Sequence, residues 1–112
     1  MKMQVDNTNP LAYGMPSQVD VFFDSSPVFR VAADSRVKRV ARFDGKNTLR
    51  SGWAWGQEYL DGGTAIVEAK SGEGKVLMMG PEVTFRGEPH ATFKLMFNGI
   101  LYGGAVAVSS VR

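Results

Sequence analysis

A chain of 112 residues, 44% hydrophobic and 21% charged, has the composition of an ordinary folded protein and not of a disordered one. Its length predicts one domain over residues 1–112, and its net charge of +2 is small. The absence of cysteine excludes disulfides, zinc–thiolate sites and thiol chemistry. No apolar leader and no run of membrane-spanning length is visible, so we expect a cytoplasmic protein without a membrane contact.

The first half of the chain predicts strands that follow an irregular start. Asn-Pro and Gly-Met-Pro breaks make residues 1–17 an irregular lead-in. Alternating apolar residues predict a strand over 18–23, and a second strand follows a turn at 28–32. A third strand, over 36–43, carries many of the basic residues. We therefore expect residues 18–80 to be mainly strands.

The clearest local pattern predicts a β-hairpin. Two apolar runs, 64–69 and 75–79, are joined by a short segment that contains Gly72 and Gly74. Both glycines suit the positive φ angles of a hairpin loop. The second run has no polar interruption, so we expect a central strand that is covered on both faces. The short aromatic segment before the hairpin, 53–60, predicts a strand end or one helical turn.

An amphipathic helix is predicted over residues 89–102, with Pro89 in its first turn and glycines after its end. Its predicted buried face follows the i, i+3, i+4, i+7, i+8 spacing and consists of Phe93, Met96, Phe97, Ile100 and Leu101. Residues 105–112 form a tail or a short strand. The predicted fold class is α+β or α/β, with a small strand-rich mixed sheet, a β-hairpin and one C-terminal helix.

Several segments resemble one known family. The resembling stretches are 9–16, 21–23, 26–29, 51–53 with Gly56, and 72–98, which together span nearly the whole chain. They are similar to the C-terminal part of the glutamine-amidotransferase-like domain that is appended to bacterial M14-type zinc carboxypeptidases. The resemblance implies the closing half of an α/β domain, without the part that would carry a nucleophile or the peptidase.

This chain lacks the catalytic residues of both enzyme activities that the resemblance suggests. An amidotransferase of this class needs a cysteine, a histidine and a glutamate, and active members read His-Pro-Glu where this chain reads Gly80-Pro81-Glu82. We expect Glu82 to cap the turn that follows it. A carboxypeptidase needs two zinc-binding histidines, whereas His90 is the only histidine in the chain. We therefore expect no catalytic residue, no metal, no cofactor and no enzyme activity.

Three classes of function remain open. The first is a non-catalytic interaction or structural module of unidentified partner, which the missing catalytic groups favour. The second is a small-molecule binder that uses Trp53 and Trp55 together with Glu82 and the 86–90 loop. The resemblance implies a loop role for Arg86 and His90. The plainer interpretation of the two tryptophans, which we favour, is that they fill the core or an interface.

The third class is nucleic-acid binding through the basic stretch 30–50. Its candidate contacts are Arg36, Lys38, Arg39 and Arg42. Strand alternation offers a simpler account, in which Arg36, Lys38 and Arg42 face water while Val37 and Ala41 face inward. No aromatic residues interleave with these charges, so we favour the solvated face over a nucleic-acid partner.

A homodimer or higher oligomer is the expected assembly. The basic strand is protected by its charge, but the apolar strands 64–69 and 76–79 are not. A second copy would cover such an edge by continuing the sheet, by packing its helix across it or by exchanging a segment. The residue types enriched at such contacts are present at Trp53, Trp55, Met78, Met79 and Met96.

Overall fold

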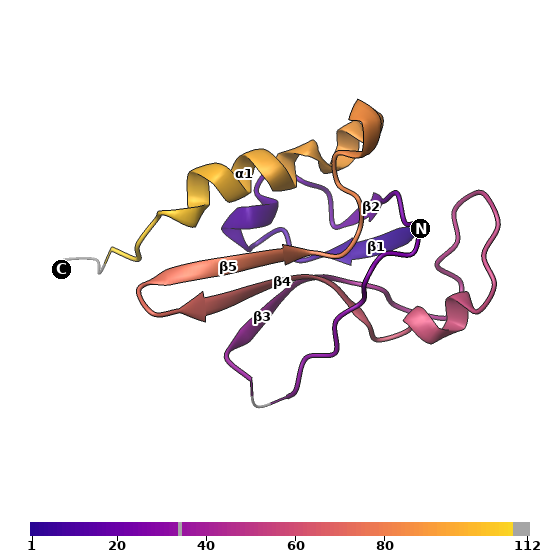
Figure 1. The fold of residues 1–112 in the computed structure, drawn as a ribbon, viewed down its shortest axis with the longest axis horizontal. Helices are drawn as coiled ribbons and strands as arrows, with labels where there is room; N and C mark the ends of the chain where they lie inside the picture. Colours follow the sequence, from indigo (N-terminus) through magenta and orange to yellow (C-terminus); the bar gives the residue numbers. More distant parts are fainter. Residues whose placement is uncertain (34, 109–112) are drawn as a thin grey trace.

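A five-stranded antiparallel sheet carries an α-helix on one of its faces (Figure 1). This computed structural model describes residues 1–33 and 35–108. The strand order is β2-β1-β3-β4-β5, so the chain has an α+β fold. The elements are β1 (Lys2–Val5), β2 (Gln18–Asp20), β3 (Val37–Arg42), β4 (Thr64–Ser71), β5 (Gly74–Met79) and α1 (Phe93–Gly103). All strand pairs are antiparallel, which corrects the predicted mixed sheet.

The predicted irregular lead-in contains a strand of the sheet. β1 pairs with β2 on one side and with β3 on the other. Met3 and Val5 are buried in the core, and their alternation with Lys2 and Gln4 is the short strand signal that the prediction missed. The rest of the lead-in is irregular apart from a 3-10 turn, η1 (Pro10–Ala12), which lies against α1.

Of the three strands predicted between residues 18 and 43, one is shorter than expected, one is nearly absent and one is confirmed. The first is shorter than expected, because β2 ends at Asp20. The predicted strand at 28–32 is reduced to a single bridge between Phe29 and Thr64. The third, β3, is confirmed, but its register against β4 shifts on both sides of Ala41. Val40 and Ala41 are consequently both buried, which breaks the alternation expected for the basic residues.

The β4–β5 hairpin is confirmed, but its second strand is not the central strand that we expected. β4 lies between β3 and β5, and its first five residues are all buried. β5 is the edge strand, and its half-buried and exposed residues alternate, with Val76 and Met78 exposed. β4 is thus the strand that is covered on both faces. In the loop only Gly72 has a positive φ, of 57°, so Gly74 does not have the predicted backbone role.

The helix is present, but its predicted buried face points away from the protein. α1 follows a 3-10 turn, η4 (His90–Thr92), and begins at Phe93. Leu95 is fully buried, and Asn98 Nδ2 donates to the carbonyls of Leu11 and Tyr13, each at 3.0 Å. A side chain at Gly99 would lie 3.4 Å from Leu77 and 3.5 Å from Leu11. Gly99 therefore lies on the side of α1 that packs against β5 and η1.

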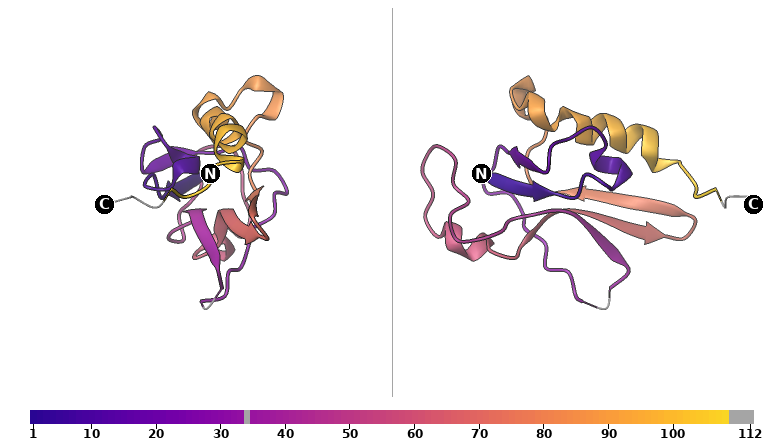
Figure 2. Two further views of the ribbon diagram at one scale, coloured as in Figure 1. Left: turned by 90° about the vertical axis from the view of Figure 1, so that its left-hand side faces the viewer. Right: turned by 180° about the vertical axis from the view of Figure 1, so that it is seen from behind.

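The two ends of the molecule differ in structure (Figure 2). A long loop, 44–63, projects from one end and contains a single 3-10 turn, η2 (Gln57–Leu60). The end of α1 and residues 105–108 lie at the opposite end. Residues 105–108 have no regular structure, and the remainder of the predicted tail lies outside the described residues.

Candidate functional site

A buried carboxylate in the centre of β4 joins three parts of the fold. Glu68 is 6% exposed. Its Oε2 accepts a hydrogen bond from Asn9 Nδ2 at 3.0 Å. Its Oε1 accepts one from the Tyr102 hydroxyl at 3.0 Å and lies 3.4 Å from Lys38 Nζ. The carboxylate therefore links the N-terminal turn and the end of α1 to the middle of the sheet.

Each partner of Glu68 is held in place by its own element. Asn9 caps η1, because its Oδ1 accepts from the backbone N–H of Leu11 at 2.9 Å while its Nδ2 reaches Glu68. Lys38 lies directly across from Glu68 in the β3–β4 pairing. Tyr102 occupies the last turn of α1, on the face that is turned toward the sheet.

The partners of Glu68 keep it ionised in spite of its burial. Desolvation by burial alone would raise the pKa of Glu68, but hydrogen bonds from Asn9 and Tyr102 and the charge of Lys38 outweigh it. The pKa of the carboxyl is therefore lower than its usual value. Burial raises the pKa of Tyr102, and its hydrogen bond to the Glu68 carboxylate raises it further. Tyr102 is thus held as a neutral hydrogen-bond donor.

A second lysine fixes the end of the helix. Lys75 Nζ donates to the carbonyls of Tyr102 and Ala105 and lies 4.0 Å from the centre of the Tyr102 ring. These contacts combine hydrogen bonds with a cation–π interaction. The Tyr102 carbonyl lies in the last turn of α1 and the Ala105 carbonyl lies beyond it. Lys75 therefore positions the segment that follows the helix.

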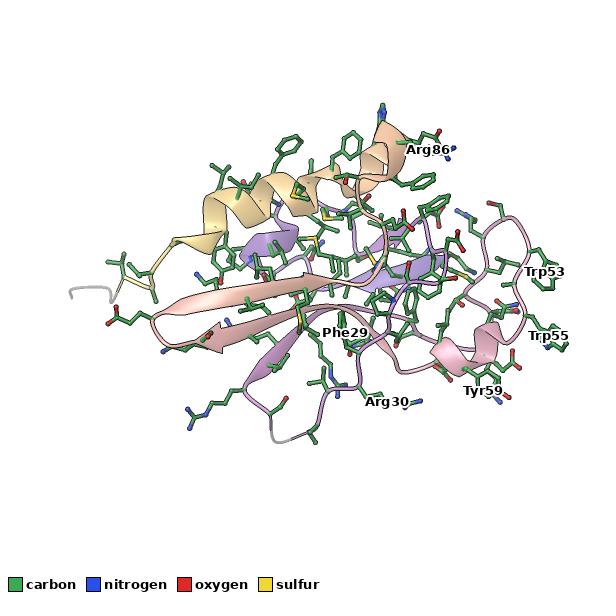
Figure 3. The ribbon with its side chains drawn as sticks, in the orientation of Figure 1. Phe29, Arg30, Trp53, Trp55, Tyr59 and Arg86 are labelled. Carbon is green, nitrogen blue, oxygen red and sulfur yellow. The ribbon has the colours of Figure 1, made fainter. Side chains whose placement is uncertain are left out.

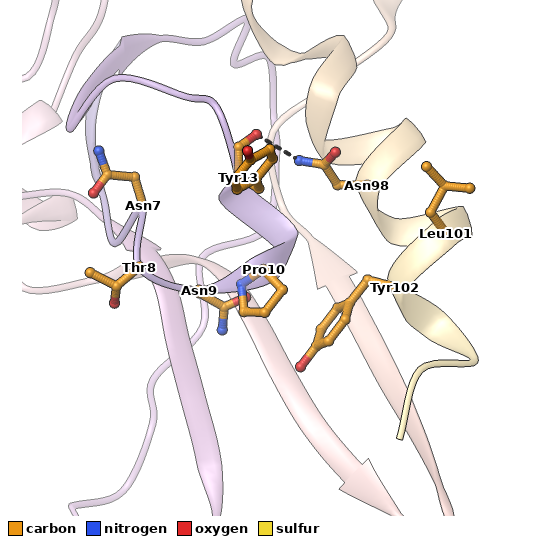
Figure 4. Close-up of a pocket in the computed structure, with 8 residues that line it drawn as sticks. All are labelled: Asn7, Thr8, Asn9, Pro10, Tyr13, Asn98, Leu101 and Tyr102. Carbon is orange, nitrogen blue, oxygen red and sulfur yellow. Dashed lines mark hydrogen bonds between the residues drawn. The ribbon is translucent and has the colours of Figure 1, made fainter. Parts of the chain in front are cut away.

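Two hollows lie on either side of this cluster, and both are lined by Pro10 and Tyr102. The smaller, of about 360 Å³, lies between η1 and α1, and Asn98 bonds to the Tyr13 carbonyl at its wall (Figure 4). The larger, of about 900 Å³, lies between the far ends of β3, β4 and β5 and the residues after α1. We call it the basic groove, since its lining includes Arg36, Lys38, Lys70 and Lys75 against only Glu68 and Glu73.

The sequence contained a signal for this cluster that the predictions did not use. Glu68 is the only charged residue in the otherwise apolar and hydroxylic run 64–69. An acid in a strand that is buried on both faces must have partners within the protein. Asn9 and Tyr102 lie 59 and 34 residues away from Glu68, so their roles needed the fold.

The predicted tryptophan site is fully exposed and is not combined with the 86–90 loop. Trp53 is 82% exposed and Trp55 90% exposed, so neither fills the core. They project from the 44–63 loop near Tyr59, whereas Arg86 lies on a separate projection before the helix (Figure 3). The structure therefore does not bring the two tryptophans and Arg86 together as one pocket.

The loop residues near α1 make local contacts. Arg86 has a positive φ of 47°, and its guanidinium lies 4.9 Å from the centre of the Phe85 ring. The His90 ring is exposed and lies 5.0 Å from the Phe93 ring. The turn after Glu82 is closed by the Glu82 carbonyl, which accepts from Phe85 N–H at 3.4 Å. The following turn, η3 (Phe85–Gly87), begins after Thr84, which makes no side-chain cap, so a capping role of the Glu82 side chain stays a prediction.

The four basic residues of the predicted nucleic-acid surface point to different neighbours. Arg36 and Lys38 line the basic groove. Arg39 donates to the Val31 carbonyl at 2.7 Å, and Arg42 pairs with Asp44 at 2.8 Å. All four are exposed, but they do not share one side of the sheet: Lys38 and Arg42 pair with Glu68 and Thr64 on one face of β4, whereas Arg39 pairs with Val67 on the other.

Comparison with known proteins returned no relative. No family, no curated protein and no solved structure matches the chain. Within residues 1–33 and 35–108, no three histidine, cysteine or acidic side chains are grouped so that they could hold a metal ion. In the same part of the chain, every helix is too short or too polar to cross a bilayer.

Proposed function

We propose that the protein is a non-catalytic structural module that associates with a second copy of itself through the outer face of α1. The observation that carries this proposal is the exposure of four large apolar side chains on one side of one helix. Their exposed fractions are 40% for Met96, 61% for Phe97, 71% for Ile100 and 79% for Leu101. We call these four residues the outer face of α1.

The size of the outer face suits a dimer contact. If a large side chain has roughly 200 Å² of surface, the four exposed fractions amount to roughly 500 Å². Two such faces would together bury about 1,000 Å², which is near the lower limit of specific interfaces. Tyr13, which is 77% exposed and lies against α1 through its carbonyl, would extend the contact.

The charge of the outer face favours a second copy over a charged partner. α1 has no acidic residue in its first turn and no basic residue in its last turn. Its single charged residue, Lys94, turns aside to donate to the Gly14 carbonyl at 2.8 Å. A two-fold contact brings each surface against itself, so a face without charge meets no like-charge repulsion.

The edge of the sheet offers a weaker alternative contact. β5 is an open edge, with Val76 46% and Met78 39% exposed on the face opposite α1. Lys75 lies on this strand, and a charged residue on an edge strand opposes edge-to-edge pairing. We therefore place the contact on α1 and not along β5.

We also infer that the chain is a counterpart of the C-terminal part of an amidotransferase-like domain. The resemblance of segments 9–16 and 72–98 supports this, and a strand-rich body followed by one helix is compatible with it. Without a cysteine nucleophile, and with Gly80 before Pro81-Glu82, we expect no release of ammonia from glutamine. A glutaminase assay that detected activity dependent on Glu82 would contradict this inference.

Sedimentation equilibrium at micromolar concentration tests the self-association. The wild-type chain should sediment at twice 12.2 kDa. Met96→Glu should shift it to 12.2 kDa, because a charge would be buried against its own copy. Met78→Glu is a matched control, since Met78 is 39% and Met96 40% exposed, and it should leave the dimer intact.

Three results would contradict the proposal. The first is a wild-type chain that is monomeric at these concentrations. The second is a dimer that Met78→Glu dissociates and Met96→Glu does not, because that result places the contact on the sheet. The third is a monomer that binds to lipid vesicles and loses this binding in Phe97→Glu, because the outer face would then serve a membrane surface.

A further inference from the structure

We propose that the basic groove binds a small multivalent anion that carries phosphate or carboxylate groups. The groove lies at the far ends of β3, β4 and β5, beyond the last turn of α1. It is separate from the outer face of α1, so the proposal does not depend on self-association. Three features of the groove favour an anion: the placement of its cations, its concave shape and a repulsion between two lysines on neighbouring strands.

Two lysines stand directly opposite each other in the groove. Lys70 of β4 is paired with Lys75 of β5 in the antiparallel register. Directly opposed residues point to the same face, with Cβ atoms about 4.5–5.5 Å apart, and like charges at such positions destabilise a sheet. Lys75 is anchored to the Tyr102 and Ala105 carbonyls, which carry no full charge to compensate it. An anion between the two lysines would remove this repulsion.

The two acidic residues of the groove do not neutralise its positive charge. Glu68 is already occupied by Asn9, Tyr102 and Lys38. Glu73, in the hairpin loop, has no ion pair among the described residues, and Arg36 and Lys70 have none either. Arg36 lines the same groove and adds a planar donor that suits phosphate or carboxylate oxygens.

The shape of the groove favours a compact ligand. Its volume of about 900 Å³ is in the range of small-molecule sites, about 300–1,000 Å³. The segment that follows α1 lines one side with Ala105, Val106 and Ala107, so the cations lie in a concave site next to apolar surface. A nucleic acid would need a charged stripe along the surface, and Arg39 and Arg42 are bound to Val31 and Asp44 instead.

Titration calorimetry at low salt with inorganic pyrophosphate, and separately with citrate, tests the proposal. The wild-type chain should bind at least one of the two, and the tighter of them identifies phosphate or carboxylate as the preferred group. Lys70→Ala should weaken binding about 10-fold or more, because it removes a charged contact. Glu73→Gln should strengthen binding, since it removes an acid from the groove. Lys46→Ala, in the loop at the opposite end, should have no effect.

The protein without ligand provides an independent measurement. Lys70→Ala should raise the melting temperature, or leave it unchanged, because it removes the repulsion with Lys75. This result also shows that any loss of binding is not a loss of folding. The proposal is overturned if neither anion binds, if Lys46→Ala weakens binding as much as Lys70→Ala, or if duplex DNA binds more tightly than both anions.

Discussion

β4 and α1 depart from the usual distribution of polar and apolar residues in opposite directions. β4 buries an acid, Glu68, in the middle of an apolar strand. α1 exposes Phe97, Ile100 and Leu101 on its outer side while Asn98 faces the N-terminal turn. In β4 the polar group is satisfied by three partners within the chain. In α1 the apolar groups have no partner among the described residues, which is why we assign them to a second copy.

This difference shows that burial in this chain is decided by contacts between elements and not by the apolar pattern of a single element. Asn98 and Gly99 lie where α1 meets η1 and β5, although neither has an apolar side chain. Four predictions on stability test this contrast, from the largest expected effect to the smallest.

The largest loss of stability is expected where α1 meets the sheet. Leu95→Ala should lower the free energy of unfolding by about 2–5 kcal/mol, because Leu95 is fully buried. Phe97→Ala should lower it by about 1 kcal/mol or less, since Phe97 is 61% exposed. Urea unfolding in the Met96→Glu background excludes any contribution from association. Similar losses for both variants would show that the buried side of α1 is assigned incorrectly.

Removal of the buried Glu68 carboxylate should cause the second-largest loss of stability. Glu68→Ala should lower the free energy of unfolding by about 1.5–3 kcal/mol, because Asn9 and Tyr102 lose a charged acceptor. Glu73→Ala is the control, as an exposed acid of the same type in the hairpin loop, and should change stability little. If both variants melt alike in thermal unfolding, Glu68 does not link the helix to the sheet.

The same carboxylate predicts a dependence of stability on pH. The pKa of Glu68 is lowered in the folded chain, so its stabilisation is fully present above its ordinary pKa of 4.5. It is lost as the pH falls through the lowered pKa of the folded state. Melting temperatures measured from neutral to acidic pH should therefore fall less in Glu68→Gln than in the wild type. Parallel curves would mean that this pKa is not lowered.

The smallest effect is expected at Thr64, at the start of β4. Its Oγ1 is buried and has no hydrogen-bond partner among the described residues. Thr64→Val keeps the shape of the side chain and removes the unsatisfied hydroxyl, so stability should be unchanged or higher by up to about 1 kcal/mol. A clear loss in a denaturant titration would show that this hydroxyl has a partner, such as a bound water.

The hairpin and the helix of the second half of the chain were predictable from the sequence. Their neighbours in the fold, and therefore which of their residues are buried, were not. The hairpin follows from two apolar runs joined by Gly72, and the helix from its periodicity. The order of the strands was not predictable, because it depends on β1, which enters the sheet between β2 and β3. That order makes β5 the edge and places β4 inside.

The two faces of α1 show why the candidate site escaped the sequence. Residues 93, 96, 97, 100 and 101 have helical spacing, but so do residues 95, 98, 99 and 102, which face the protein. The first set is more apolar, so its pattern alone favoured the wrong side. Tyr102 was therefore not recognised as a partner of Glu68, and Lys75 was not recognised as its neighbour.

Cysteine cross-linking on α1 tests the central assignment most directly, because the natural chain has no cysteine. Ile100→Cys places one thiol on the outer face, where a two-fold contact would bring it near its own copy. Mild oxidation should convert this variant to a covalent dimer of twice 12.2 kDa, whereas Lys46→Cys in the distant loop should remain monomeric on a denaturing gel. If Ile100→Cys cross-links no faster than Lys46→Cys, the outer face of α1 does not meet a second copy.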